Sequence, residues 1–142
     1  MSTPSELMQL VDDAWNAQDW TTFARYHADD VVVRLPGQPP SHGVEHHEAD
    51  ARRVFATFPD NQVSNRPYRV LLAEGDWTCS IARFSGTMTE PMHLPDGTVL
   101  PPTGKSFEVD FCTVARWADG RIVEENLFYD RDAMMRQLGL TA

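Results

Sequence analysis

The sequence has few cysteines and no long apolar run. Its two cysteines, Cys79 and Cys112, are too few for a metal cage or for the disulfide framework of a small secreted domain. Both lie in strand-like segments, so we expect two buried free thiols. No stretch approaches the roughly 18 apolar residues of a membrane span, and the N-terminus lacks the basic and apolar regions of a signal peptide. We therefore expect a cytoplasmic protein.

Basic side chains are also scarce. The chain carries 12 Lys and Arg against 21 Asp and Glu, which gives a formal net charge of −9. A polyanion is repelled by such a protein unless one face concentrates its basic groups. The arginines are scattered among acidic residues, so the sequence predicts neither nucleic acid nor an anionic membrane as a partner.

Motifs for phosphate binding and nucleophilic catalysis are missing. There is no glycine-rich phosphate loop and no G-x-S-x-G pattern. His42, His46, His47 and Asp50 form the only cluster of metal-ligand residue types, but Gly43 interrupts the helical spacing that would align them. We interpret this cluster as the solvated start of a helix, with His47 alone turning inward. We accordingly expect no metal site and no cofactor.

What the sequence does contain is the composition of one globular domain. Apolar residues make up 42% of 142 residues, enough for a single core, so we assign one domain to residues 1–142. Thr3, Pro4 and Glu6 are typical of a helix start, and Asp19 is a candidate cap for a second helix. A third helix is predicted over residues 44–58, because its apolar residues recur at the spacing of one helical face.

The second half of the chain has the pattern of strands. Strands are predicted over residues 31–33, 68–73, 77–88, 105–117 and 121–129, and a last helix over 132–138. Four successive strands indicate an antiparallel meander covered on one face by the helices, which is an α+β architecture. The proline-rich segment 89–104 is predicted to be a long loop near a pocket mouth. The sheet carries too many aromatic residues for two dry faces, so we expect a homodimer that buries part of the outer face.

Several short sequence segments, together with the order of elements, resemble a known protein family. The order of elements resembles the SnoaL-like polyketide cyclase family of the nuclear-transport-factor-2-like superfamily, and so do the segments YHADD (26–30), PPTG (101–104), WADGRIVEE (117–125) and RQLG (136–139). The resemblance spans nearly the whole chain. It implies a cone-shaped barrel, made of a strongly curved and mostly antiparallel sheet whose concave face is covered by three N-terminal helices.

The resemblance also implies an apolar pocket in which relatives perform acid–base chemistry on hydrophobic carbonyl compounds without metal or cofactor. Those cyclases place a His on the penultimate strand and an Asp on the last strand. Thr113 and Leu127 occupy these positions here. The ketosteroid isomerases of the superfamily carry a base before a proline on the first strand, where this chain has Leu35 before Pro36. Both familiar sets of catalytic groups are therefore absent.

Glu125 is the leading candidate for a catalytic group. A three-residue turn with a bulge at Gly120 would pair Trp117 with Arg121 and would place Glu125 on the apolar face, opposite Thr113. Burial among aromatic residues would then raise the pKa of Glu125 toward the range of a general acid or base. A two-residue turn would instead flip the last strand, so that Asn126, Phe128 and Asp130 look inward.

Two further titratable residues need an assignment. His27 lies at the apolar end of the second helix, where it could shuttle a proton near neutral pH, although such a histidine is also a common core or capping group. Asp130 precedes the last helix, and we expect it to cap that helix. The candidate pocket walls are Trp15, Tyr26, Leu35, Phe55, Phe58, Phe111, Thr113, Leu127 and Tyr129.

Three functions remain open from the sequence. The first is a cofactor-free lyase or isomerase (cyclase, dehydratase or enolising isomerase) that uses Glu125 and His27 on a small hydrophobic carbonyl compound. The second is a non-catalytic binding protein for a small hydrophobic ligand, which the missing dyad favours. The third is an interaction module that recruits a protein through the exposed face of its sheet.

Overall fold

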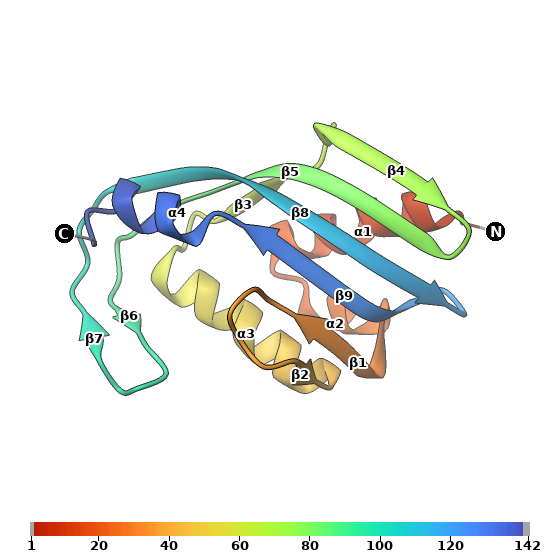
Figure 1. The fold of residues 1–142 in the computed structure, drawn as a ribbon, viewed down its shortest axis with the longest axis horizontal. Helices are drawn as coiled ribbons and strands as arrows, with labels where there is room; N and C mark the ends of the chain where they lie inside the picture. Colours follow the sequence, from red (N-terminus) through yellow and green to blue (C-terminus); the bar gives the residue numbers. More distant parts are fainter. Residues whose placement is uncertain (1, 141–142) are drawn as a thin grey trace.

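The computed structural model describes residues 2–140, which form an α+β fold (Figure 1). The elements in chain order are α1 (Pro4–Ala17), α2 (Trp20–Arg25), β1 (His27–Arg34), β2 (Ser41–His42), α3 (Val44–Thr57), β3 (Gln62–Ser64), β4 (Val70–Glu74), β5 (Trp77–Thr87), β6 (Met92–His93), β7 (Val99–Leu100), β8 (Ser106–Ala118), β9 (Arg121–Tyr129) and α4 (Arg131–Gln137).

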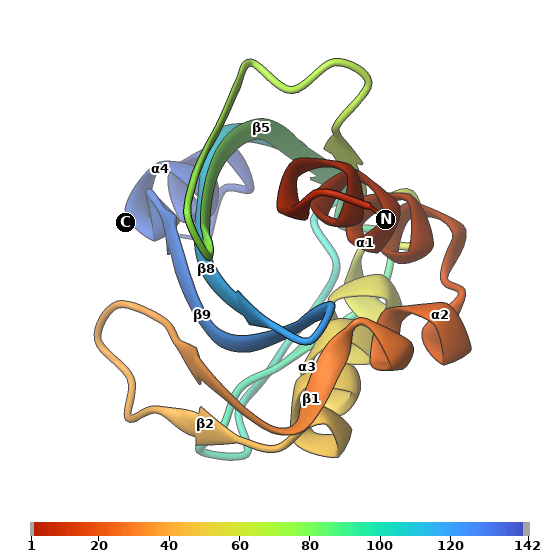
Figure 2. The same cartoon turned by 90° about the vertical axis from the view of Figure 1, so that its right-hand side faces the viewer.

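A curved sheet holds the fold together. Its strand order is β2-β1-β9-β8-β5-β3, with β4 also paired to β5, and every pairing is antiparallel except that of β1 with β9. The sheet bends strongly, and α1, α2 and α3 lie on its concave side (Figure 2). The predicted fold class and the four-strand meander, β4-β5-β8-β9, are confirmed. The sheet remains open, with β2 and β3 at its edges, so the cone is not a closed barrel.

The helix ends follow the predicted caps. Thr3 accepts a hydrogen bond from the backbone N–H of Glu6 before α1, and Asp19 accepts one from Thr22 before α2. Asp130 caps α4 in the same way, by accepting from the N–H of Ala133, as the sequence predicts. These side chains satisfy backbone donors that have no partner within their helices.

The turn between β8 and β9 differs from the predicted one. Asp119 and Gly120 both have positive φ and form a two-residue turn, so Ala118 pairs with Arg121. Such a turn alone would send Glu125 outward. One extra residue, Val123, enters β9 where the register shifts, and it restores the inward direction of Glu125. Glu125 consequently pairs with Ala115, not with Thr113.

The core lies between the concave face and the helices. Most of the sheet's aromatic side chains point into it, while Trp77 and Phe128 on the outer face are 40% and 50% exposed. Fewer aromatic side chains than expected lie on the outer face and need a partner to cover them. The homodimer therefore stays a prediction. Cys79 and Cys112 are free but only half-buried, which corrects the expectation of buried thiols.

The segment 89–104 is not a structureless loop. It contains the small hairpin of β6 and β7, with Met92 paired to Leu100. This hairpin projects from the body of the molecule beneath the end of α4 (Figure 1). Among the described residues, no helix combines the length and the apolar character needed to cross a bilayer.

Gly86 tests how tightly the helices pack on the sheet. A Cβ at this position would lie 2.9 Å from Cβ of Phe58 and 3.1 Å from Cε1 of Phe107, both in the core. We expect Gly86→Ala to lower the free energy of unfolding by about 1–3 kcal/mol, as overpacking does. Ser85→Ala, on the same strand, is the control with an expected change below about 0.5 kcal/mol. Equal midpoints of urea denaturation for the two variants would contradict this packing.

Candidate active site

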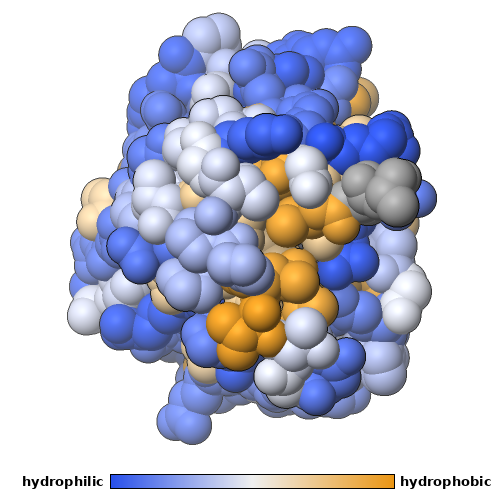
Figure 3. Space-filling view, turned by 90° about the vertical axis from the view of Figure 1, so that its left-hand side faces the viewer, coloured by the Kyte–Doolittle hydropathy of each residue, from blue (hydrophilic) through white to orange (hydrophobic). Residues whose placement is uncertain are grey.

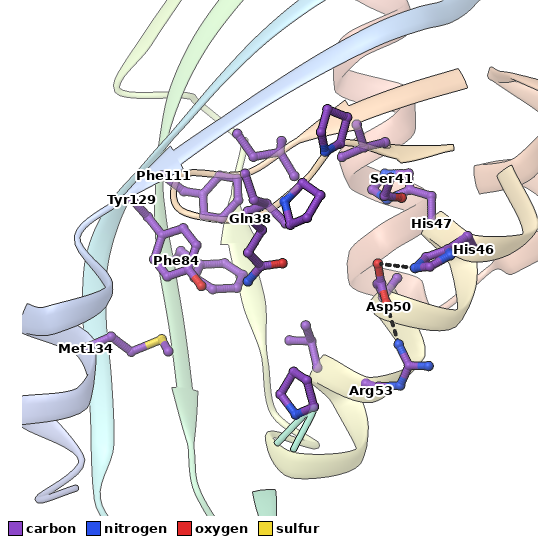
Figure 4. A pocket seen from close by; sticks show the side chains of 18 of the residues that line it. Gln38, Ser41, His46, His47, Asp50, Arg53, Phe84, Phe111, Tyr129 and Met134 are labelled. Atoms are coloured by element: carbon purple, nitrogen blue, oxygen red, sulfur yellow. Dashed lines mark hydrogen bonds and ion pairs between the residues drawn. The ribbon is translucent and has the colours of Figure 1, made fainter. Parts of the chain in front are cut away.

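A large apolar cavity of about 670 Å³ opens between α3 and the sheet, a size typical of small-molecule sites. In Figure 4, Phe84, Phe111 and Tyr129 stand on the sheet side, with Asp50 and Arg53 of α3 across the pocket. Phe111 and Tyr129 stack with ring centroids 5.2 Å apart. Figure 3 faces the end of the molecule with α4 and β6–β7, where apolar side chains gather within a polar surround. Residues 93–95 of the predicted mouth segment line the cavity.

A second, inner cavity of about 50 Å³ lies deeper in the cone. It shares four lining residues with the large cavity, which are His47, Phe84, Phe111 and Leu127. Its other lining residues include the polar side chains of Asp12, Ser80, Thr113 and Glu125. A ligand in the large cavity therefore meets, at its inner end, a small chamber in which these polar groups lie among apolar walls.

The chamber contains a buried carboxylate between two imidazoles. Oε2 of Glu125 lies 3.2 Å from Nε2 of His27 and 3.1 Å from Nε2 of His47. All three side chains are at most 9% exposed. Three separate elements bring them together: His27 begins β1, His47 lies in the first turns of α3, and Glu125 is on β9. Phe23 of α2 packs against both imidazole rings.

His27 carries a proton on each ring nitrogen. Its Nδ1 lies 2.7 Å from the backbone carbonyl oxygen of Phe23, and its Nε2 faces Glu125. Both partners are acceptors, so each nitrogen must donate. Burial alone would lower the pKa of His27, but the hydrogen bond and charge of Glu125 outweigh it and raise this pKa above its usual value.

Glu125 is ionised. Burial alone would raise its pKa, as the sequence predicts, but the two imidazoles outweigh burial and hold the pKa of Glu125 well below its usual range. The expectation of a raised pKa is therefore wrong. It failed because the sequence does not show that His27 and His47 converge on this carboxylate. An ionised Glu125 is suited to orienting an imidazole rather than to donating a proton.

Asp12 supplies the carboxyl group that titrates near neutral pH. Burial and the nearby charge of Glu125 raise the pKa of Asp12 to about 7, although the hydrogen bond from the Tyr68 hydroxyl to Oδ2 of Asp12 lowers it. In return, burial and the charge of Asp12 raise the pKa of Tyr68. Asp12 is half-buried and lines the inner cavity. A carboxyl with this pKa can act as a general acid or base at pH 7.

The structure divides the predicted pocket walls into two groups. Those that line one or both cavities are Trp15, Leu35, Phe58, Phe111, Thr113, Leu127 and Tyr129. Tyr26 and Phe55 line neither cavity, which corrects their assignment as walls: Tyr26 packs beside the core, and Phe55 belongs to an aromatic cluster with Trp15 and Trp20. Thr113 and Leu127 pair with each other across β8 and β9.

Asp12 was missed as a site residue, although the sequence holds a signal for it. Leu10, one of the apolar residues of α1, is 38% exposed. The helix is rotated so that Met8 and Val11 are buried, and Asp12 turns toward the cavity. The signal in the sequence is that Asp12 directly follows Val11, a residue of the buried face of this helix. His47 turns inward as expected, while His46 and Asp50 form an exposed ion pair.

Fold and site together define a cone whose apolar pocket ends in a smaller inner cavity, and this cone is the nuclear-transport-factor-2-like fold. The family model of the SnoaL-like polyketide cyclases matches residues 5–138. The chain belongs to this family.

Solved structures support the fold over the full length. IdmH from Streptomyces antibioticus, provisionally named a polyketide cyclase, is 29% identical over 97% of this chain and 99% of its own, with a TM-score of 0.80. TsrD from Streptomyces laurentii is 24% identical over 99% of both chains (TM-score 0.80). A provisionally named SnoaL-like polyketide cyclase from Jannaschia sp. CCS1 is 24% identical over 100% and 99% (TM-score 0.81). A comparison with curated protein sequences finds no significant match.

The two carboxyl groups should titrate far apart. In ¹³C NMR of the side-chain carboxyls, we expect Asp12 to titrate near pH 7 and Glu125 to remain ionised from pH 8 down to pH 4. Tyr68→Phe removes a hydrogen bond that favours ionised Asp12, so the Asp12 midpoint should move upward. A midpoint near 4 for Asp12 in the wild type would contradict the described chamber.

Proposed function

We propose that this protein uses its own side chains to catalyse a proton-transfer reaction on a hydrophobic carbonyl compound, as a cyclase, dehydratase or enolising isomerase. The observation that carries this proposal is the position of His47. It lines both the apolar cavity and the polar chamber, and its Nε2 contacts the ionised carboxylate of Glu125.

His47 is assigned as the general base. Glu125 accepts from Nε2 and so favours the tautomer in which Nδ1 carries the lone pair, as a carboxylate does for the imidazole of a catalytic triad. Nδ1 is assigned as the atom that takes a proton from a ligand, because His47 lines both cavities while its Nε2 faces Glu125. Glu125 therefore acts by orienting and stabilising the base, and not as the general acid or base first expected.

Asp12 is assigned as the general acid, and His27 as a positioning residue. The raised pKa of Asp12 keeps about half of this carboxyl protonated near pH 7, so it can donate to a carbonyl oxygen in the chamber. His27 lines neither cavity. Its double hydrogen bond to Phe23 and Glu125 fixes the carboxylate and compensates its charge.

A ring closure illustrates the chemistry. His47 takes a proton from the carbon next to a carbonyl group, and the C–H electron pair forms an enol whose oxygen takes the proton of Asp12. The enol carbon then attacks a second carbonyl carbon of the same molecule. The enol oxygen returns its proton to Asp12, and the new alkoxide takes the proton held by His47. Both side chains end in their starting states.

The shape of the large cavity favours a flat, apolar substrate. Phe111 and Tyr129 are nearly parallel, with 13° between their rings, and Phe84 packs against both. Aromatic faces of this kind bind planar, conjugated rings by offset stacking. A substrate lying on this wall would reach the chamber with one polar end while the rest of the molecule stays in the apolar cavity.

Deuterium exchange tests proton transfer without the natural substrate. We expect the protein to accelerate exchange of the α-protons of 2-tetralone, a flat bicyclic ketone, in D₂O with EDTA present, followed by ¹H NMR. His47→Gln and Asp12→Asn should each slow the catalysed exchange by about 100-fold, the usual contribution of a general acid or base. His42→Gln, an exposed histidine outside both cavities, is the control and should exchange like the wild type.

The outcomes separate the competing functions. Saturable binding of the ketone without faster exchange would identify a binding protein and overturn the catalytic proposal. Wild-type rates in His47→Gln would remove His47 as the base. Unchanged activity in Glu125→Gln would remove the orienting role of the carboxylate, provided that thermal melting shows the variant to be folded.

The stacked wall makes a separate prediction. Phe111→Ala removes one ring of the stacked pair while leaving His47 and Asp12 in place, so the affinity for the ketone should fall by about 3- to 10-fold, the worth of one aromatic contact. The exchange rate at saturating ketone should change less. Fluorescence titration measures the affinity, and an unchanged Kd would contradict binding on this wall.

A further inference from the structure

The side chains of His27, His47 and Glu125 have the arrangement of a metal site as well as of an acid–base site. Their donor atoms Nε2, Nε2 and Oε2 all lie within 4.8 Å of one another, and the carboxylate oxygen is 3.1 and 3.2 Å from the two nitrogens. A metal with bonds of about 2.0–2.2 Å places neighbouring donors about 3.0–3.4 Å apart. The two nitrogen–oxygen separations already match a common ion, and the third separation, between the two nitrogens, is at most 4.8 Å.

The hydrogen bonds around His27 also fit a metal ligand. Nδ1 of His27 donates to the backbone carbonyl oxygen of Phe23 at 2.7 Å, which fixes the ring and directs Nε2 at Glu125. Metal-bound histidines are held in this way, with the second nitrogen donating to a carbonyl or carboxylate. With Nδ1 donating to Phe23, an Nε2 without its proton would be an acceptor that faces a second acceptor, the carboxylate of Glu125. A cation must therefore lie between these two atoms. A proton fills this role, and a metal ion can replace it.

Space for the remaining ligands of an ion lies on one side. Glu125 and His47 line the inner cavity, whereas His27 is buried behind them. The cavity of about 50 Å³ holds one or two water molecules. Three protein ligands with an open, water-filled position make an accessible site rather than a closed structural one.

We propose that His27, His47 and Glu125 bind one divalent transition-metal ion of the Zn²⁺ class, which displaces the protons from this triad. Two imidazoles and a carboxylate suit Zn²⁺, Co²⁺ or Fe²⁺, whereas Mg²⁺ prefers oxygen ligands. The site goes beyond the proposed acid–base function. Because His47 cannot hold a metal and accept a substrate proton at once, the bound ion inhibits that function.

The test measures binding on the EDTA-treated protein after dialysis against Zn²⁺ or Co²⁺. We expect about one Zn²⁺ per chain and Co²⁺ absorption bands typical of nitrogen and oxygen ligands. At a hundredfold excess over Kd, the Tm should rise by roughly 5 °C or more. Mg²⁺ should produce none of these changes. His47→Gln, at the edge of the site, and Glu125→Gln should each lower the affinity at least tenfold.

His42→Gln is the control, because His42 is exposed and lies outside the triad. Zinc binding below 0.2 per chain, or equal binding by wild type and His47→Gln, would overturn the proposal. Loss of metal affinity in His42→Gln would place the ion at the surface and would also overturn it. Each variant is checked for folding by circular dichroism. Exchange of 2-tetralone in EDTA reports on the acid–base function separately, so either proposal can fail alone.

Discussion

A single ionised carboxylate inside an apolar cone is the constraint around which the site is built. A charge as buried as that of Glu125 is stable only when hydrogen-bonding partners compensate it. His27 and His47 supply them from β1 and α3, so the pairing ties two segments far apart in the sequence to the last strand. Removing one of the three side chains leaves the other two buried without compensation. A substitution in the site should therefore also lower the free energy of unfolding.

That carboxylate also sets the properties of its neighbours. Its charge raises the pKa of His27 and contributes to the raised pKa of Asp12. Glu125 stays ionised, and its charge helps to keep the pKa of Asp12 near neutral pH. The two carboxyl groups of the chamber therefore differ in their pKa values. The proposed acid–base groups come from α1 and α3, and the carboxylate that orients His47 comes from β9.

Much of the fold could be predicted because local rules decide it. Thr3, Asp19 and Asp130 cap helices through contacts within three residues, and the alternating apolar pattern of β8 fixes its buried face. The inward direction of Glu125 was predicted from a three-residue turn, but it depends on a two-residue turn followed by the extra residue Val123. The sequence alone does not predict the position of such a bulge, because the free energy of the bulge depends on tertiary packing around it.

The sequence by itself determined the order of elements, which follows from periodicity, and its resemblance to a known family predicted the apolar pocket. Only the tertiary structure decided the protonation of the site. Glu125 was expected to have a raised pKa, and burial does act in that direction, but two histidines, 98 and 78 positions away in the sequence, reverse it. Electrostatic interactions depend on distances between atoms, and the fold alone sets those distances.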